Sequence, residues 1–96
     1  MEKDEILELL GDIEHPAIRY SLIKLGILTD IHYMDKRVKA VFAFPFPNIP
    51  IADKLIDSVK ITLKNFNIVF DYSTRLMTDP EKQNFLKLEH EAWKGL

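Results

Sequence analysis

The sequence predicts an α+β domain in which helices pack on one face of a small three-stranded sheet, in the order α-β-β-α-β-α. Apolar residues recur at helical spacing near both ends and in the middle of the chain. Three segments between those helices alternate with the period of a strand. The chain has 96 residues, 47% of them hydrophobic and 29% charged, which is typical of one globular domain, residues 1–96.

Charge and composition exclude several classes of function. Thirteen basic and fifteen acidic residues give a formal net charge of -2, whereas nucleic-acid binding relies on an excess of Lys and Arg. No nucleic-acid partner is therefore expected. The chain has no cysteine and so has no disulfide, thiolate ligand or cysteine nucleophile. A charged start and the lack of a long apolar run predict a cytoplasmic protein without membrane association.

The first helix is expected over residues 2–13, where Ile6, Leu9, Leu10 and Ile13 form an apolar face. It should end before Pro16, because the residue that precedes a proline is displaced from the helical region. Residues 15–26 follow as a connector with a single helical turn, which Gly26 closes.

A hairpin follows the connector. In residues 27–34, Ile27, Thr29, Ile31 and Tyr33 alternate with Leu28, Asp30, His32 and Met34. Asp35-Lys36 supplies a tight turn. The return strand, residues 38–44, places Val38, Ala40, Phe42 and Phe44 on the face that should lie against the core.

The second helix is expected to begin at Pro50, with Ile49 as its N-cap, because proline suits the first helical position. Its apolar residues are Ile51, Leu55, Val59 and Leu63. Asn65-Phe66-Asn67 ends the helix, since asparagine tolerates the left-handed conformation. A third strand is expected over residues 68–73.

The last helix, residues 79–96, follows Thr78-Asp79-Pro80-Glu81, which has the spacing of a capping box. Either Thr78 or Asp79 can be the N-cap. The apolar residues of this helix are Phe85, Leu88, Ala92 and Trp93. They are expected to pack on the domain itself or on a twin subunit, and docking in the groove of a partner is the alternative.

The loop between the second strand and the second helix is the main candidate site. A strand that leads into a helix N-terminus often builds an anion or metal site, but Ile49 occupies the position that would carry the chemistry. Ile49 can fill the core, or it can join Phe44 and Phe46 in an apolar surface for a protein partner. The candidate binding residues are Phe44, Phe46, Pro47, Asn48, Ile49, Pro50 and Asp53.

Other polar residues are weaker candidates. Asp30 and His32 have strand spacing and share a face, but two ligands do not make a metal site, and a solvated pair is expected. His15 beside Glu14 lacks a nucleophile and is expected to end the first helix at its favourable dipole end. His90 should lie on the surface. No catalytic residue, metal or cofactor is therefore predicted, and the protein is not expected to be an enzyme.

Two motifs resemble the iron–sulfur cluster assembly domain family related to SufT and PaaD, long catalogued as a domain of unknown function. The family's Asp-Pro-Glu motif aligns with His15-Pro16-Ala17, and its Val-Asp-Leu-Gly-Leu-Val type segment aligns with residues 23–28. Its Thr-Pro-Gly-Cys-Pro-Leu-Ala-Asp type loop aligns with residues 46–53. The shared positions are Pro16, Leu25, Gly26, Pro47, Pro50, Ala52 and Asp53.

The departures from the family pattern fall where its chemistry would lie. Ile49 replaces the loop cysteine, His15 and Ala17 replace acidic residues, and so does Lys24. The resemblance implies a variant without the cysteine that assists iron–sulfur cluster or metal-centre assembly as a non-enzymatic adaptor. Its partners would be proteins of cluster assembly, contacted through residues 44–53, and a homodimer fits the same interpretation. The alternative is a binding module for a small anionic ligand at the helix N-terminus near Pro50.

Overall fold

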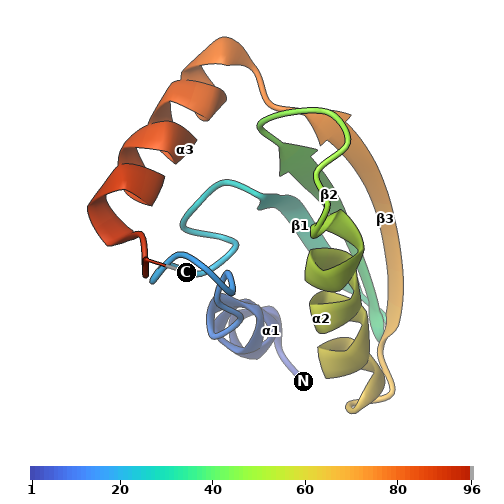
Figure 1. The fold of residues 1–96 in the computed structure, drawn as a ribbon. Coiled ribbons are helices and arrows are strands. Elements are labelled where there is room, and N and C mark those ends of the chain that lie inside the picture. The colour runs from blue at the N-terminus through green and yellow to red at the C-terminus, as the bar shows by residue number, and fades with distance from the viewer. Residues whose placement is uncertain (96) are drawn as a thin grey trace.

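The computed structural model describes residues 1–95 and has the α+β fold that the sequence predicts (Figure 1). The elements are α1 (Lys3–Gly11), β1 (Leu28–Met34), β2 (Arg37–Phe44), α2 (Ala52–Lys64), β3 (Val69–Leu76) and α3 (Asp79–Ala92). β2 is the central strand, antiparallel to β1 and parallel to β3. Within residues 1–95, no helix has both the length and the apolar content that a membrane crossing requires.

The hairpin closes through Asp35 and Lys36, which both have positive φ angles, 52° and 59°. This is the backbone that a two-residue type I′ turn requires, so the expected tight turn is confirmed. The unbroken alternation expected over residues 27–34 is wrong, because a β-bulge interrupts β1 between Thr29 and His32. The extra residue shifts the pattern, so that Leu28 lies opposite Phe42 and Tyr33 lies opposite Val38.

The core lies between the sheet and the helices. Val38, Ala40, Phe42 and Phe44 of β2 are buried, as expected, and α2 buries Leu55, Ile56, Val59 and Leu63. Phe42 is fully buried at the centre of an aromatic group, with its ring centroid 6.1 Å from that of Phe44 and 5.7 Å from that of Tyr72. Aromatic pairs at these separations stabilise the packing beyond the area they bury.

α2 begins later than the sequence predicts, at Ala52 with Ile51 as N-cap, and neither Pro50 nor Ile49 holds the expected position. The backbone N–H of Ala52 donates to the carbonyl of Ile49 at 3.1 Å. Ile51 has φ -96° and ψ 8°, the values of the third residue of a type I turn. Pro50 therefore occupies the second position of a turn, which its fixed φ favours, and the helix starts after that turn.

The third strand and the end of α2 lie close to their expected places. Asn67 has a φ of 57° and reverses the chain after α2, as the asparagines there predict. β3 extends to Leu76, three residues beyond the expected end, and every residue from Val69 to Leu76 is in register with β2. The two strands run parallel because α2 crosses between them.

The connector between α1 and β1 is part of the core. Ile18, Leu22 and Leu25 are fully buried, and Gly26 closes the segment with a φ of 78°. α1 ends at Gly11, before Pro16 as expected, although the helix is shorter than residues 2–13. The connector runs between α1 and the C-terminal end of α3 (Figure 1).

α3 is joined to the connector by its C-terminal end. The backbone N–H of Arg19 donates to the carbonyl of Ala92 at 3.0 Å, and that of Lys94 donates to the carbonyl of Ala17 at 3.0 Å. Phe85, Leu88 and Ala92 are buried within the domain itself. The helix ends at Ala92, not at residue 96, which lies outside the described residues. Trp93 is 49% exposed, so packing on the domain covers it only in part, and packing on a twin subunit stays a prediction.

Candidate functional site

The predicted loop lies beside the C-terminal end of β3 and forms one wall of an open hollow. The hollow has a volume of about 390 Å³ and lies between the loop, the first turns of α2 and the last residues of β3. Its lining residues are Phe44, Phe46, Pro47, Asn48, Ile49, Ala52, Asp53, Ile56, Thr74, Arg75 and Leu76. Six of the seven predicted binding residues line this hollow, and Pro50 lies in the turn next to it.

The apolar surface at this hollow differs from the one expected. Phe44 is buried under the sheet, and Ile49 is only partly exposed because it packs against the core. Phe46 is 45% exposed and Leu76 is 55% exposed. The most exposed apolar side chains of the lining are therefore Phe46 from the loop and Leu76 from β3.

The orientation of Phe46 is held by α3. The Nζ atom of Lys82 lies 4.5 Å from the centroid of the Phe46 ring, within the range of a cation–π interaction. Asp53, another lining residue, lies in the first turn of α2, where a carboxylate interacts favourably with the helix dipole. The hollow therefore has one acidic side chain in its lining and a basic side chain over its exposed aromatic ring.

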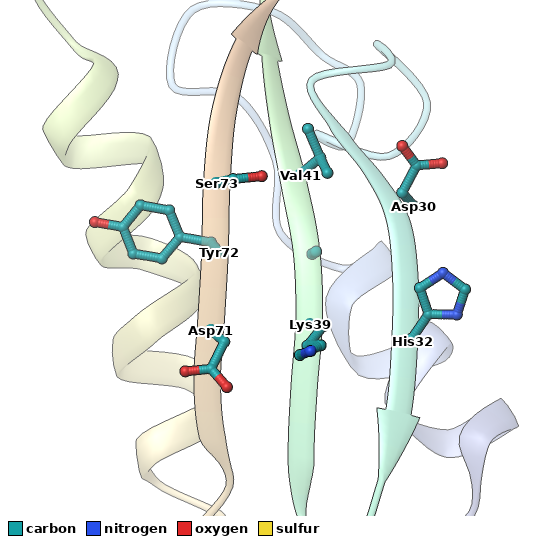
Figure 2. Close-up of a pocket in the computed structure, with 8 residues that line it drawn as sticks. Asp30, His32, Lys39, Val41, Asp71, Tyr72 and Ser73 are labelled. Atoms are coloured by element: carbon teal, nitrogen blue, oxygen red, sulfur yellow. The ribbon is translucent and has the colours of Figure 1, made fainter.

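Asp30 and His32 line a different hollow, of about 420 Å³, on the sheet face that the helices leave open (Figure 2). Both are exposed and lie near Lys39 and Asp71, and Asp71 forms an ion pair with Arg37. In the part of the chain that the structure describes, no three His, Cys, Asp or Glu side chains converge as a metal site would require. Because both side chains are exposed and line the same hollow, the expectation that they share a solvated face is confirmed.

His15 does not end the first helix, so that prediction is wrong. α1 ends four residues earlier, and His15 is buried in the connector, where its Nδ1 accepts from the backbone N–H of Ala17 at 3.0 Å. Burial, and then the charge of Lys94, lower the pKa of His15 below its ordinary value of 6.5. Glu14 is exposed and pairs with Lys94 at 3.5 Å. His15 therefore stabilises the turn at Pro16, and Glu14 engages the end of α3.

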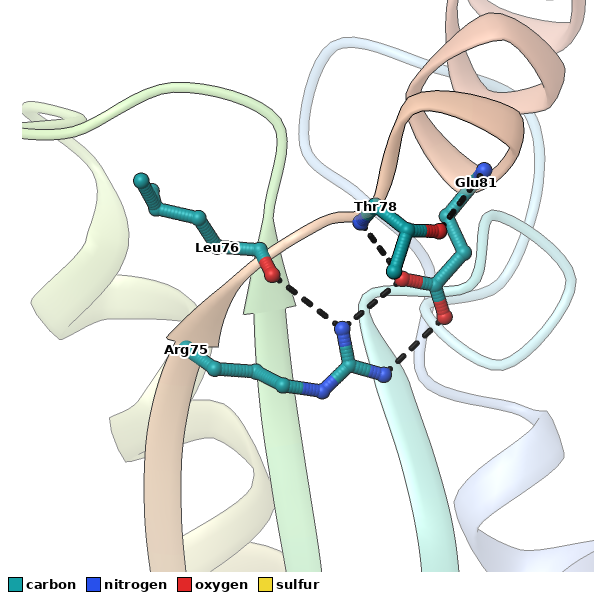
Figure 3. Close-up of polar contacts among 4 residues, drawn as sticks. All are labelled: Arg75, Leu76, Thr78 and Glu81. Atoms are coloured by element: carbon teal, nitrogen blue, oxygen red, sulfur yellow. Dashed lines mark hydrogen bonds and ion pairs between the residues drawn. The ribbon is translucent and has the colours of Figure 1, made fainter.

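The end of β3 is fixed to the start of α3 by Arg75 and Glu81 (Figure 3). Arg75 donates to the two carboxylate oxygens of Glu81 at 2.7 and 2.9 Å and to the carbonyl of Leu76 at 3.1 Å. Glu81 also accepts from the backbone N–H of Thr78 at 2.8 Å, and Thr78 accepts from that of Glu81 at 3.4 Å. Thr78, not Asp79, is therefore the N-cap, and the capping box is confirmed.

Several residues of the hollow escaped prediction from sequence. Thr74, Arg75 and Leu76 come from β3, more than twenty positions after the loop in the chain. Parallel pairing brings the carboxyl ends of β2 and β3 to the same edge, so both the loop and Leu76 lie there. The one sequence feature that could have indicated this part of the site is the apolar Leu76 after the polar pair Thr74-Arg75. The same pattern is also typical of the end of a strand.

The sequence matched no protein-family model and no curated protein. Its fold is similar to that of a solved structure, the crystal structure of the domain of unknown function DUF59 from Bacillus anthracis. The two superpose with a TM-score of 0.62 at 16% identity, over 85% of this chain and 81% of that one. At this identity the likeness establishes the fold. The chain therefore adopts the fold of a DUF59 domain.

Proposed function

We propose that this domain is a non-enzymatic adaptor in the assembly of iron–sulfur clusters or metal centres, and that it binds protein partners at the hollow beside residues 44–53. The observation that carries the proposal is the exposed ring of Phe46 beside Leu76, on the loop whose motif resembles the cluster assembly family. A fold like that of a DUF59 domain supports the same assignment. A cytoplasmic location follows from this role.

The absence of cysteine favours an adaptor over a carrier of the cluster. A thiolate at the start of α2 would be stabilised by the helix dipole, but Ile49 offers no donor atom. The domain can therefore contribute apolar contacts and surface charge, while the partner supplies the ligands of the cluster. Phe46 is the natural anchor, because exposed aromatic residues are enriched among the hot spots of interfaces.

The alternative of a small anionic ligand at the start of α2 is less well supported. The side chain of Asp53 already places a negative charge in the first turn, and Ile51 provides no side-chain cap. An anion would meet this carboxylate on approach. The lining of the hollow favours an apolar contact instead.

The test compares two phenylalanines of nearly equal exposure at opposite ends of α2. Phe46 is 45% exposed and Phe66 is 47% exposed. The full chain, carrying Phe46→Asp or Phe66→Asp, serves as bait in an anaerobic lysate, and captured proteins are identified by mass spectrometry. Ile49 is less suitable for substitution because it packs against the core.

The wild type and Phe66→Asp should both recover scaffold or carrier proteins of cluster assembly. Phe46→Asp should reduce this recovery about 30-fold, the effect of losing a hot spot of about 2 kcal/mol. Circular dichroism must show that both variants remain folded. Equal recovery by all three baits would exclude the hollow as the binding surface, and recovery of no cluster-assembly protein by the wild type would refute the proposed role.

A further inference from the structure

The two edges of the sheet differ in how they are protected against pairing with another strand. β1 is interrupted by a bulge at which Asp30 adopts a φ of 52°. β3 is a regular strand from Val69 to Leu76 that contains no Pro, Gly or Lys, and it is the outermost strand of the sheet (Figure 1). Bulges, prolines and lysines are three devices by which proteins prevent edge pairing, and β3 has none of these three. Its charged residues, Asp71 and Arg75, are of opposite sign.

The hydrogen bonds of β3 to β2 show which of its backbone groups face outward. The N–H of Val69 donates to the carbonyl of Lys36 at 2.9 Å, and that of Met77 donates to the carbonyl of Phe44 at 2.8 Å. Because successive residues of a strand direct their backbone groups to opposite sides, the odd-numbered residues bond to β2. The outward residues are Phe70, Tyr72, Thr74 and Leu76, whose N–H groups have no backbone acceptor within residues 1–95.

Exposed apolar side chains also lie along the outer side of β3. Tyr72 and Leu76 are exposed, and so is Ile61 of α2. Ile61, Ile68 and Phe70 line a hollow of about 470 Å³ between α2 and β3, whose other lining residues, Asp57, Lys60 and Lys64, are charged. An unpaired strand edge beside exposed apolar side chains is the arrangement that strand addition uses.

We propose that two copies of this chain pair through β3, antiparallel, to form a dimer with one continuous six-stranded sheet. When two β3 strands pair antiparallel about a two-fold axis, only every second register brings an outward-facing residue of one copy opposite an outward-facing residue of the other. One of these registers sets Ser73 on the axis, with Phe70 opposite Leu76 and Tyr72 opposite Thr74 of the second copy. This register pairs every residue from 70 to 76.

Charge selects this register over its neighbours. It places Asp71 opposite Arg75 of the second copy, twice, on the open face of the sheet. Asp71 already pairs with Arg37, and Arg75 with Glu81, so Arg37, Asp71, Arg75 and Glu81 would form a row of alternating charge across the axis. If the register shifts by two residues in either direction, Asp71 no longer lies opposite Arg75, because it then faces Ser73 or Met77 of the second copy. Opposite charges directly across an antiparallel pair stabilise it.

The dimer goes beyond the proposed function and does not depend on it. The first test measures mass by analytical ultracentrifugation from about 1 μM to about 100 μM, the range in which a micromolar dimer dissociates. The wild type should approach twice its chain mass of 11.2 kDa at the high end. Thr74→Pro removes one outward N–H but no bond to β2, so this variant should stay folded and remain monomeric.

The second test determines the register and uses the absence of native cysteine. In the proposed register residue 73 faces itself across a non-hydrogen-bonded pair, about 4.5 Å apart between Cα atoms, within disulfide range. Under mild oxidation, Ser73→Cys should give a covalent dimer, whereas Tyr72→Cys and Thr74→Cys should not. All three positions are exposed in the single chain, so access of the thiol is matched.

Each outcome decides the proposal. A wild type that keeps a mass of 11.2 kDa at every concentration would overturn it. Faster linkage at position 72 or 74 would show that the register is wrong, and equal linkage at all three would indicate random collision and overturn the pairing. A Thr74→Pro variant that stays folded and still doubles its mass would also overturn the pairing.

Discussion

The guanidinium of Arg75 holds both carboxylate oxygens of Glu81, at 2.7 and 2.9 Å, across the junction between β3 and α3. The same carboxylate accepts from the backbone N–H of Thr78, so one side chain connects the end of a strand to the cap of a helix. The junction fixes the direction in which α3 leaves the sheet. It thereby places Lys82 over Phe46 at the candidate site.

This junction should make the stability of the protein sensitive to acid. The hydrogen bonds from Arg75 and then from Thr78 lower the pKa of Glu81 from 4.5 to about 2. Because its folded pKa lies below its unfolded pKa, Glu81 stabilises the fold fully above about pH 4.5, and this contribution is lost as the pH falls through about 2. Glu81→Gln should lower Tm at pH 7 and have progressively less effect toward pH 2.

Thermal unfolding of the wild type and Glu81→Gln from pH 7 to pH 2 measures this difference. Glu89→Gln, on the same helix, is the control and should leave the pH profile unchanged. A Tm difference that stays constant across the whole range would show that the carboxylate of Glu81 is not engaged in the folded protein.

His15 should produce a second pH dependence, closer to neutrality. Its folded pKa is lowered below 6.5 by burial and by Lys94, so the unfolded chain binds the proton more readily. Stability is therefore complete above about pH 6.5 and decreases as the pH falls from there toward the lower folded pKa. His15→Asn can still accept from Ala17 but does not titrate, so its urea midpoint should change less between pH 7.5 and pH 5.5.

His15→Ala adds a test of the hydrogen bond itself. Loss of the acceptor for the Ala17 N–H, with loss of packing, should cost about 1–3 kcal/mol at pH 7.5. His90→Asn, on the exposed end of α3, is the control for His15→Asn, and its urea midpoint should change with pH as that of the wild type does. If the urea midpoints of the wild type and His15→Asn changed equally between pH 7.5 and pH 5.5, the lowered pKa of His15 would be contradicted.

Two glycines should respond to alanine with opposite signs. Gly26 has a φ of 78°, and a Cβ added there meets no atom within 4 Å, so the cost comes from the backbone alone. Gly26→Ala should lose about 1 kcal/mol, whereas Gly11→Ala, in α1 and equally uncrowded, should gain about 0.5 kcal/mol. Urea unfolding at one fixed protein concentration measures both. Equal stability of the two variants would contradict the strained backbone at Gly26.

Much of the fold follows from short-range patterns in the sequence. The spacing of Leu55, Val59 and Leu63 predicts a helix, and Thr78 with Glu81 predicts where the last helix begins. Positive φ at Asp35 and Asn67 likewise follows from residues that tolerate it. Two predictions were wrong because another local structure formed in place of the expected one. Pro50 lies in a turn and not at the first helical position, and a bulge at Asp30 interrupts the expected alternation.

Only part of the candidate site could be predicted from the sequence. The motif at residues 46–53 identified the loop, and its apolar character suggested a contact surface. Leu76, Arg75 and Lys82 were missed, since nothing in their local sequence relates them to that loop. They reach it through the parallel pairing of β2 and β3 and through the direction of α3.

Local patterns in the sequence are sufficient for the number, order and type of the elements, because helical and strand periodicity, capping and turn residues act over a few positions. Three features depend on tertiary contacts instead: the burial of His15, the exposure of Leu76, and the outward edge of β3. Each depends on which segments distant in the chain come together. Strand order and packing set those neighbours, and no short window of sequence contains both members of such a contact.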